Sequence, residues 1–220
     1  MRNTPNKKLL AFIGMSGVGK SYWTEKFRQI GYQTFNIDDL IPEKLGSIID
    51  DVEADKNVKF EETKVGDLAK WMGFPGDKRY AVNAKKYLNL ETKITEQAIK
   101  QAIKNGQNTI IDTTGSVIYT DKKIQSLLRS HTKVVFFDTT KQNLKEMFKV
   151  FCKVPKPIIW GNIYKAKKGE TEAETLARCY QELLNFRIKK YKKLSHIALP
   201  FKFTHTPNLD TTKFLKKISK

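Results

Sequence analysis

The chain has 220 residues, 40% of them hydrophobic and 11% aromatic, which is enough to bury the core of a folded domain. It lacks the run of about 18 or more apolar residues that a membrane span requires. The first apolar segment, residues 9–13, is too short for a signal-peptide core, so we expect a cytoplasmic protein without membrane contact. Cys152 and Cys179 show no metal-binding spacing and are expected to be reduced thiols.

The chain is strongly basic. Lysine and arginine total 41 against 23 aspartate and glutamate residues, which gives a formal net charge of +18. Such a balance attracts polyanions such as RNA and DNA. The lysines are dispersed along the whole chain, however, as is typical of solvated helix faces. We favour solvated lysines and keep nucleic-acid binding as the second interpretation.

Short apolar segments alternate with segments of helical periodicity. We expect strands at residues 9–13, 32–37, 109–111, 134–137 and 197–199. We expect helices at residues 21–30, 67–72, 84–104, 120–129, 142–152, 170–194 and 211–218. This alternation indicates an α/β fold with a parallel sheet covered on both faces. No repeat or linker interrupts the pattern, so we expect one domain over residues 1–220, and a monomer.

A phosphate-binding motif follows the first predicted strand and opens the first predicted helix. The pattern G-x-x-x-x-G-K-[ST] is matched in full by Gly14, Met15, Ser16, Gly17, Val18, Gly19, Lys20 and Ser21. Glycines let successive backbone N–H groups point at phosphate oxygens, and the helix N-terminus adds its dipole. Lys20 is expected to reach the β- and γ-phosphates and Ser21 to bind Mg²⁺. The motif therefore predicts ATP and Mg²⁺ as ligands.

Carboxylates follow two predicted strands, at the edge of a parallel sheet where ligands bind. Asp38 and Asp39 follow the second strand, where a carboxylate can orient an acceptor hydroxyl and take its proton. One of them can instead cap the next helix, and we favour Asp38 for the chemistry. Asp112 follows the third strand, as a Walker B carboxylate does, or else serves as a cap or turn. We expect Ser21, Asp38 and Asp112 to be metal ligands.

Two charged residues interrupt apolar helix faces. Arg187 lies on the apolar stripe of residues 170–194, and Glu91 lies on that of residues 84–104. A buried guanidinium needs a partner, which can be a phosphate, an anionic substrate or a structural carboxylate. Glu91 can pair with Arg187 or with another base. Thr114 and the backbone of Gly115 follow Asp112 and are expected to hydrogen-bond a polar substrate.

These motifs resemble those of the shikimate kinase family of P-loop enzymes over most of the chain. Beyond the phosphate loop, the similar elements are Asp38-Asp39-Leu40-Ile41 for D-x-x-I, Glu91 for the Glu of F-R-x-x-E, Thr113-Thr114-Gly115 for the glycine triplet, Lys156-Pro157-Ile158-Ile159 for the lid sequence R-P-L-L, and Arg187-Ile188-Lys189-Lys190-Tyr191 for R-x-x-x-Y.

The resemblance implies a five-stranded parallel sheet in the order 2-3-1-4-5. It also implies a lid at about residues 153–168 and a substrate-binding helical region at about residues 50–105. The implied reaction transfers the γ-phosphoryl group of ATP to a hydroxyl of a small molecule. Asp38 and Arg187 would contact the substrate, and Lys156 would act from the lid. Residues 206–208 occupy the place expected for an adenine-binding loop.

The chain also departs from the family pattern. Leu88 stands where the family has an arginine that binds the substrate carboxylate, and the lid arginine is Lys156. Asn36 stands where the family usually has a second aspartate. Arg79, within an additional segment, is the candidate that could supply the missing charge.

Three functions compete at this point. The first is a shikimate-kinase-like small-molecule kinase in which Lys20, Asp38 and Lys156 are catalytic. The second is a polynucleotide or nucleoside kinase, which the basic charge favours. The third is a regulatory module that binds ATP without turnover, which the altered substrate motifs favour.

Overall fold

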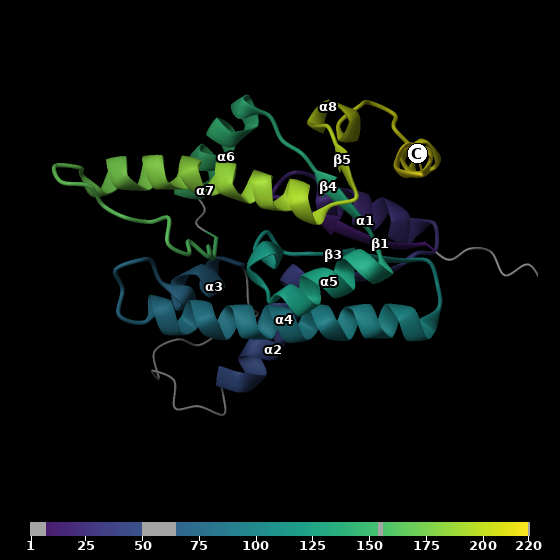
Figure 1. Ribbon diagram of the computed structural model, residues 1–220, viewed down its shortest axis with the longest axis horizontal. Coiled ribbons are helices and arrows are strands. Elements are labelled where there is room, and N and C mark those ends of the chain that lie inside the picture. Colours follow the sequence, from purple (N-terminus) through teal and green to yellow (C-terminus); the bar gives the residue numbers. More distant parts are fainter. Residues whose placement is uncertain (1–7, 50–64, 154–155, 220) are drawn as a thin grey trace, which may run out of the picture.

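The sheet is built around the first apolar segment of the chain. In this computed structural model, which describes residues 8–49, 65–153 and 156–219, β1 (Leu9–Ile13) pairs in parallel with β3 (Thr109–Asp112) and β4 (Lys133–Phe137). β2 (Gln33–Asn36) and β5 (Ile197–Leu199) are the edge strands. The order β2-β3-β1-β4-β5 confirms the predicted five-stranded parallel sheet (Figure 1).

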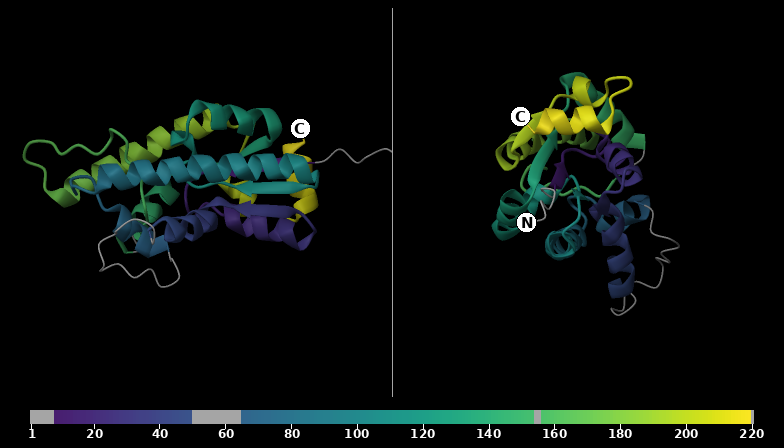
Figure 2. Two further views of the ribbon diagram at one scale, coloured as in Figure 1. Left: turned by 90° about the horizontal axis from the view of Figure 1, so that it is seen from below. Right: turned by 90° about the vertical axis from the view of Figure 1, so that its right-hand side faces the viewer.

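Helices connect the strands and cover both faces of the sheet. Their bounds are α1 (Lys20–Gln29), α2 (Ile37–Ile49), α3 (Val65–Met72), α4 (Tyr80–Asn105), α5 (Lys122–His131), α6 (Lys141–Lys153), α7 (Glu172–Leu194), α8 (Phe201–Thr204) and α9 (Thr211–Ile218), with a short 3-10 helix η1 at Val117–Tyr119. The two longest, α4 and α7, run along the long axis of the molecule and extend beyond the sheet (Figures 1 and 2). Residues 156–171, which precede α7, lie beside the start of α4, where Tyr80 Oη contacts the backbone of Ile158 and Trp160.

Consecutive residues of β4 show how the two layers form. Because side chains of a strand alternate between its faces, Phe136 and Phe137 point in opposite directions. Phe136 stacks on Tyr191 of α7, with ring centroids 5.3 Å apart. Phe137 packs against Phe214 of α9 at 5.9 Å. The α9 face also carries α1, and the other face carries α4 and α5 with α7 (Figure 2).

The second predicted strand, residues 32–37, ends one residue too late, because Ile37 begins α2. The sequence pattern did not predict this helix. Asn36 Oδ1 accepts a hydrogen bond from the Asp38 backbone N–H at 3.2 Å and so helps to start this helix. Asp38 and Asp39 lie in its first turn, where carboxylates complement the helix dipole. Pro42 lies inside the helix, and an internal proline argues against helix in a sequence.

The other predicted strands and helices lie within a few residues of observed ones. The short elements η1 and α8 were not predicted. Residues 50–64 of the expected substrate-side region and residues 154–155 of the expected lid lie outside the described residues. Among the described residues, no helix is long and apolar enough to cross a membrane.

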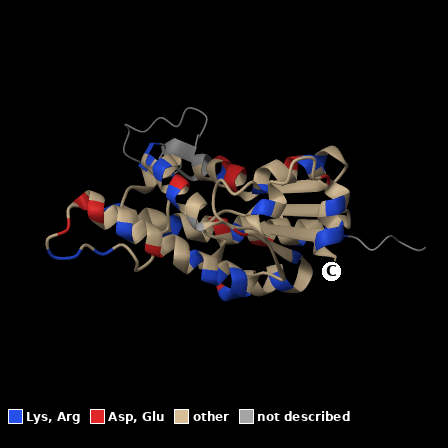
Figure 3. Ribbon diagram, turned by 90° about the horizontal axis from the view of Figure 1, so that it is seen from above, with Lys and Arg blue, Asp and Glu red and all other residues tan. Residues whose placement is uncertain are grey.

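Basic residues are spread over the fold. On the side shown in Figure 3, lysine and arginine lie on several helices, at strand ends and in the segment before α7, and they form no single stripe.

Phe214 of α9 is the centre of the aromatic part of the core. It is fully buried, and its ring lies between 4.6 and 6.3 Å from the rings of Phe12, Trp23, Phe27, Phe137 and Phe203. These ring contacts join α1, β1, β4, α8 and α9.

We expect Phe214→Ala to lower the free energy of unfolding by about 3–5 kcal/mol, because the cavity would remain lined by rigid rings. Urea denaturation followed by circular dichroism measures this loss. Val150→Ala, at an exposed position of α6, is the control and should change stability by less than about 0.5 kcal/mol. Equal losses in the two variants would contradict the assignment of this core.

Candidate active site

The phosphate loop, residues 14–21, joins the end of β1 to the start of α1. Gly14, Gly17 and Gly19 have φ of 148°, 84° and 92°, values that side chains strongly disfavour. A Cβ at Gly14 would also lie 2.9 Å from the Phe137 carbonyl oxygen. The glycines of the motif are therefore required by the backbone itself, and Met15 and Val18 anchor the loop by pointing into the core.

Lys20 lies inside this loop. Its side chain is 5% exposed, and Nζ donates to the carbonyl oxygens of Gly14 at 3.4 Å and Met15 at 3.2 Å. Lys20 is also the first residue of α1, so the positive end of the helix dipole faces the same space. The loop thus combines backbone N–H groups, a helix N-terminus and a fixed cation, which is the arrangement that binds phosphates.

Asp112 and Ser21 form the candidate metal centre. Ser21 Oγ donates to Asp112 Oδ2 at 2.8 Å, and Thr24 Oγ1 donates to the same oxygen at 3.3 Å. Asp112 Oδ1 is buried without a hydrogen-bond partner, and burial raises the pKa of this carboxyl. These hard oxygen donors fit Mg²⁺. Within the described segments, no three His, Cys, Asp or Glu side chains converge, so phosphate oxygens and water would complete the coordination.

Asp38 faces the phosphate loop from the first turn of α2. Burial raises the pKa of its carboxyl to about 6, against the opposing effect of the Lys20 charge. Asp112, Lys156 and Asp39 also act on this carboxyl electrostatically. Asp38 is therefore close to the loop, the candidate metal centre and the lid lysine. Asp39 is exposed and accepts a hydrogen bond from Asn36 Nδ2 at 2.5 Å.

Lys156 reaches the phosphate loop from the segment between α6 and α7. Its Nζ donates to Ser16 Oγ at 2.8 Å, across 140 residues of sequence. The expected lid residue and the loop are therefore in contact in this structure.

Glu91 does not pair with Arg187, so the alternative of an ion pair between these two residues is not observed. The carboxylate of Glu91, which is fully buried, accepts hydrogen bonds from the hydroxyls of Thr114 and Ser116, the latter at 2.6 Å. Burial raises its pKa to about 7, although both hydroxyls lower it. The hydroxyls satisfy Glu91 because they follow β3 directly beneath α4.

Arg187 instead lies beside the loop that follows β3. A Cβ at Gly115 would lie 3.3 Å from Arg187 Nη1 and 3.7 Å from the backbone nitrogen of Ser16. Gly115 is thus the narrow point at which the phosphate loop and Arg187 approach each other. Asp38, Thr114, Gly115 and Arg187, all predicted to bind the substrate, gather at the carboxyl edge of the sheet.

Arg79 is the predicted substrate residue that does not join this group. Arg79 is the exposed residue that precedes α4. Its side chain lies beside Gly73, since a Cβ placed on Gly73 would be 3.3 Å from Arg79 Nε. Asp77 lies at the same turn. No described contact brings Arg79 to Arg187.

Sequence reasoning missed Ser116 and His205. Ser116 is the second hydroxyl on Glu91, and only the pairing of α4 with β3 reveals it. His205 lies next to the phosphate loop, since a Cβ placed on Gly19 would be 3.5 Å from a carbon of the His205 ring. The His205 ring also stacks on that of Phe201, with ring centroids 3.7 Å apart. This stack directly precedes residues 206–208, the expected adenine loop.

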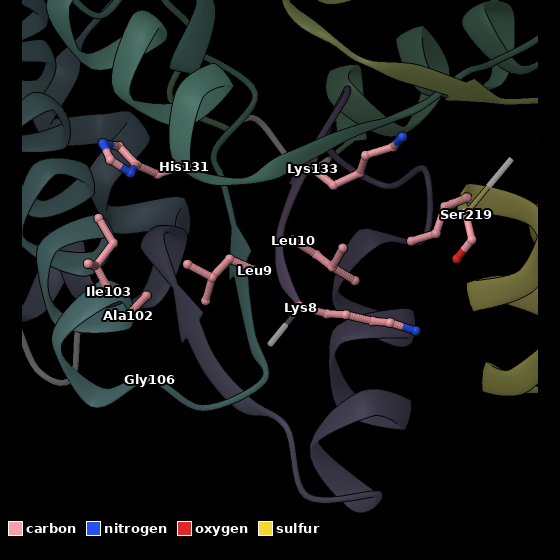
Figure 4. Close-up of a pocket in the computed structure, with 10 residues that line it drawn as sticks. Lys8, Leu9, Leu10, Ala102, Ile103, Gly106, His131, Lys133 and Ser219 are labelled. Carbon is pink, nitrogen blue, oxygen red and sulfur yellow. The ribbon is translucent and has the colours of Figure 1, made fainter. Parts of the chain in front are cut away.

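A pocket of about 570 Å³ lies at the opposite edge of the sheet (Figure 4). It is lined by Lys8, Leu9, Leu10, Ala102, Ile103, Gly106, His131, Lys133, Ile218 and Ser219. These residues come from the starts of strands and the ends of helices. Ligands of parallel sheets bind at the carboxyl ends of strands, so this pocket is separate from the candidate active site.

Solved structures share this fold. A shikimate kinase from Acinetobacter baumannii in complex with shikimate is similar with a TM-score of 0.56 and 14% identity, covering 97% of this chain and 92% of that one. A shikimate kinase from Aquifex aeolicus gives 0.52 and 15%, with 96% of each chain covered. A dephospho-CoA kinase from Campylobacter jejuni gives 0.51 and 12%, covering 97% and 94%.

The chain therefore has a P-loop kinase fold of the nucleoside-monophosphate-kinase-like type. Neighbours with two different substrates share it to a similar degree, so the fold alone does not select an acceptor. No protein-family model and no curated protein matches the chain by sequence.

The raised pKa of Glu91 predicts a pH-dependent stability. Between its ordinary value of 4.5 and about 7, the folded chain keeps a proton that the unfolded chain has released. The stabilisation from this group is therefore complete below about pH 4.5 and is lost as the pH rises to about 7. Relative to Glu91→Gln, the parent protein should lose up to about 3 kcal/mol of unfolding free energy over this range.

Urea denaturation at several pH values measures this difference. Glu146→Gln, at an exposed position of α6, is the matched control. Parallel stability curves for Glu91→Gln and the parent protein would show that Glu91 does not retain its proton in the folded state.

Proposed function

We propose that the chain transfers the γ-phosphoryl group of ATP to a hydroxyl of a small molecule. The observation that carries this proposal is the gathering of Lys20, Asp38, Asp112 and Lys156 around one phosphate loop. If no carboxylate lay where it could bind an acceptor hydroxyl, the P-loop would indicate a protein that only binds nucleotides. Here Asp38 supplies such a carboxylate.

Each of these residues has its own role in the proposed reaction. The loop and Lys20 hold the β- and γ-phosphates, and Lys156 approaches the same phosphates from the lid. Ser21 and Asp112 would hold Mg²⁺, which when bound neutralises phosphate charge. Asp38 orients the acceptor hydroxyl and takes its proton as the oxygen attacks the γ-phosphorus. The bond from that phosphorus to the bridging oxygen breaks, and ADP leaves.

The pKa of Asp38 suits this role. With a pKa of about 6, the carboxyl is ionised at neutral pH and can accept a proton without being a very weak base. The acceptor would be held by Arg187, Thr114 and the backbone of Gly115. Because Arg187 is buried without a carboxylate partner among the described residues, it favours an acceptor that carries an anionic group.

The enzyme is shikimate-kinase-like in this proposal, with an acceptor that differs from shikimate or binds in a different way. Leu88 stands where the resemblance expects a cation, and Arg79 is exposed at the residue before α4. The net charge of +18 favours the second candidate, a polynucleotide or nucleoside kinase. The altered substrate motifs favour the third, an ATP-binding regulatory module without turnover.

One assay tests these candidates. It measures ADP release from ATP and Mg²⁺ with separate additions of shikimate, nucleosides, sugars and a 5′-hydroxyl oligonucleotide.

We expect Lys20→Ala to abolish acceptor-dependent ADP release. We expect Asp38→Asn to reduce turnover about 100-fold or more while ATP still binds. Full activity in either variant would contradict the proposed mechanism. ATP binding without turnover for any acceptor would favour the regulatory module.

The lid lysine provides a separate test. We expect Lys156→Ala to lower kcat by about tenfold to 100-fold, because Lys156 stabilises charge that develops during transfer. The ATP dissociation constant should change much less. Lys156→Arg keeps the charge and is the matched control, so it should retain most of the activity. A variant that changes ATP affinity alone would assign Lys156 to ground-state binding.

A further inference from the structure

The lid segment that the structure describes, residues 156–164, has no helix or strand of its own, yet it is firmly packed. Trp160 is 1% exposed. Its ring lies 5.5 Å from that of Phe74, in the turn between α3 and α4, and 5.1 Å from that of Tyr164. Phe74 and Tyr164 also meet each other, at 4.9 Å. These three edge-to-face contacts join the lid segment to the turn that precedes α4.

The hydroxyl of Tyr80, the first residue of α4, holds the backbone of the same segment. Tyr80 Oη donates to the Ile158 carbonyl at 3.1 Å and accepts from the Trp160 N–H at 2.9 Å. Between these two residues, the Ile159 carbonyl accepts a hydrogen bond from Arg187 Nη2 at 3.0 Å. Three consecutive residues of the lid segment are therefore fixed by side chains from α4 and α7.

Tyr80 is itself firmly placed. The Phe74 N–H donates to Asp77 Oδ2 at 2.6 Å, which closes the turn before α4. Asn83 Nδ2, in the first turn of α4, donates to the Trp71 carbonyl near the end of α3 at 2.7 Å. Tyr80 lies between these two hydrogen bonds in the sequence, so its hydroxyl has a fixed position from which to hold the lid segment.

Lys156 is close to this fixed stretch of backbone. Only Pro157 separates it from Ile158, and a proline fixes its own φ and restricts the conformation of the residue before it. The restricted backbone therefore continues to Lys156, whose Nζ donates to Ser16 Oγ at 2.8 Å. A charge that stabilises a transition state has to be held in place, and on an irregular segment other residues must hold it.

We propose that Tyr80 is a positioning residue for Lys156. Its hydroxyl sets the lid backbone, and through Pro157 this backbone directs the lysine to the phosphate loop. The inference rests on the proposed function, in which Lys156 stabilises charge during transfer. Because Tyr80 belongs to α4, the helix that also carries Glu91, one helix then supports both the lid charge and the segment after β3.

Kinetics of Tyr80→Phe, which removes the hydroxyl and keeps the ring, test this role. In the full chain we expect this change to lower kcat by on the order of tenfold, because Lys156 is displaced. The ATP dissociation constant should change much less. Added to Lys156→Ala, Tyr80→Phe should lower kcat no further, because its effect acts through Lys156. A merely structural role would lower kcat by the same factor in both backgrounds.

Acetylation of Lys156 by acetic anhydride, quantified by mass spectrometry, reports the position of the lysine without turnover. We expect Tyr80→Phe to raise the rate several-fold at Lys156 and to leave it unchanged at Lys122, an exposed residue of α5. Tyr164→Phe is the matched control, because the Tyr164 ring lies in the same cluster and its hydroxyl makes no hydrogen bond with the described residues. This control should match the parent protein in both measurements.

Either an unchanged acetylation rate at Lys156 or an unchanged kcat in Tyr80→Phe overturns the inference. An equal loss of kcat with and without Lys156→Ala overturns it as well. If no acceptor is phosphorylated, the proposed function is contradicted, whereas faster acetylation of Lys156 in Tyr80→Phe would still support the placement of this lysine by Tyr80.

Discussion

The hydrogen bond from Ser21 to Asp112 joins the two strands on which the site depends. Ser21 follows β1 and Asp112 ends β3, and these strands are neighbours in the sheet. With β1 in the centre, the phosphate loop touches the segments that follow both neighbouring strands. Gly14 meets the backbone of β4, and Gly115 after β3 meets the backbone of Ser16. The topology therefore brings phosphate loop, carboxylate and acceptor segment together before any side chain is considered.

Glu91 is held by residues that depart from the family pattern. Leu88 offers Glu91 no charge. The hydroxyls of Thr114 and Ser116 donate to both carboxylate oxygens instead. Glycine at these two positions could not do this. The hydroxyls after β3 therefore keep Glu91 buried without an ion pair.

The sequence predicted the parts of the fold and site that local patterns encode. Continuous apolar strands, helical periodicity and the phosphate motif each depend on neighbouring residues, and they located the sheet, most helices and the loop. Helix α2 was missed because Pro42 hides its periodicity. The hydroxyl partners of Glu91 were not predicted, because they depend on how α4 packs against the segment after β3. Ser116 carries no local signal, since its hydroxyl meets Glu91 only where α4 packs against the segment after β3.

The unused polar atoms of this chain are concentrated where the reaction is proposed to occur. Five buried side-chain polar atoms lack a hydrogen-bond partner within the described residues, and three of them belong to Asp112, Tyr119 and Arg187. Each such atom reduces stability, since its interactions with water are lost on folding and not replaced. A fold selected for stability alone would pair or remove them. Ligands of the proposed reaction would supply partners of this kind, Mg²⁺ at Asp112 and an anionic acceptor at Arg187.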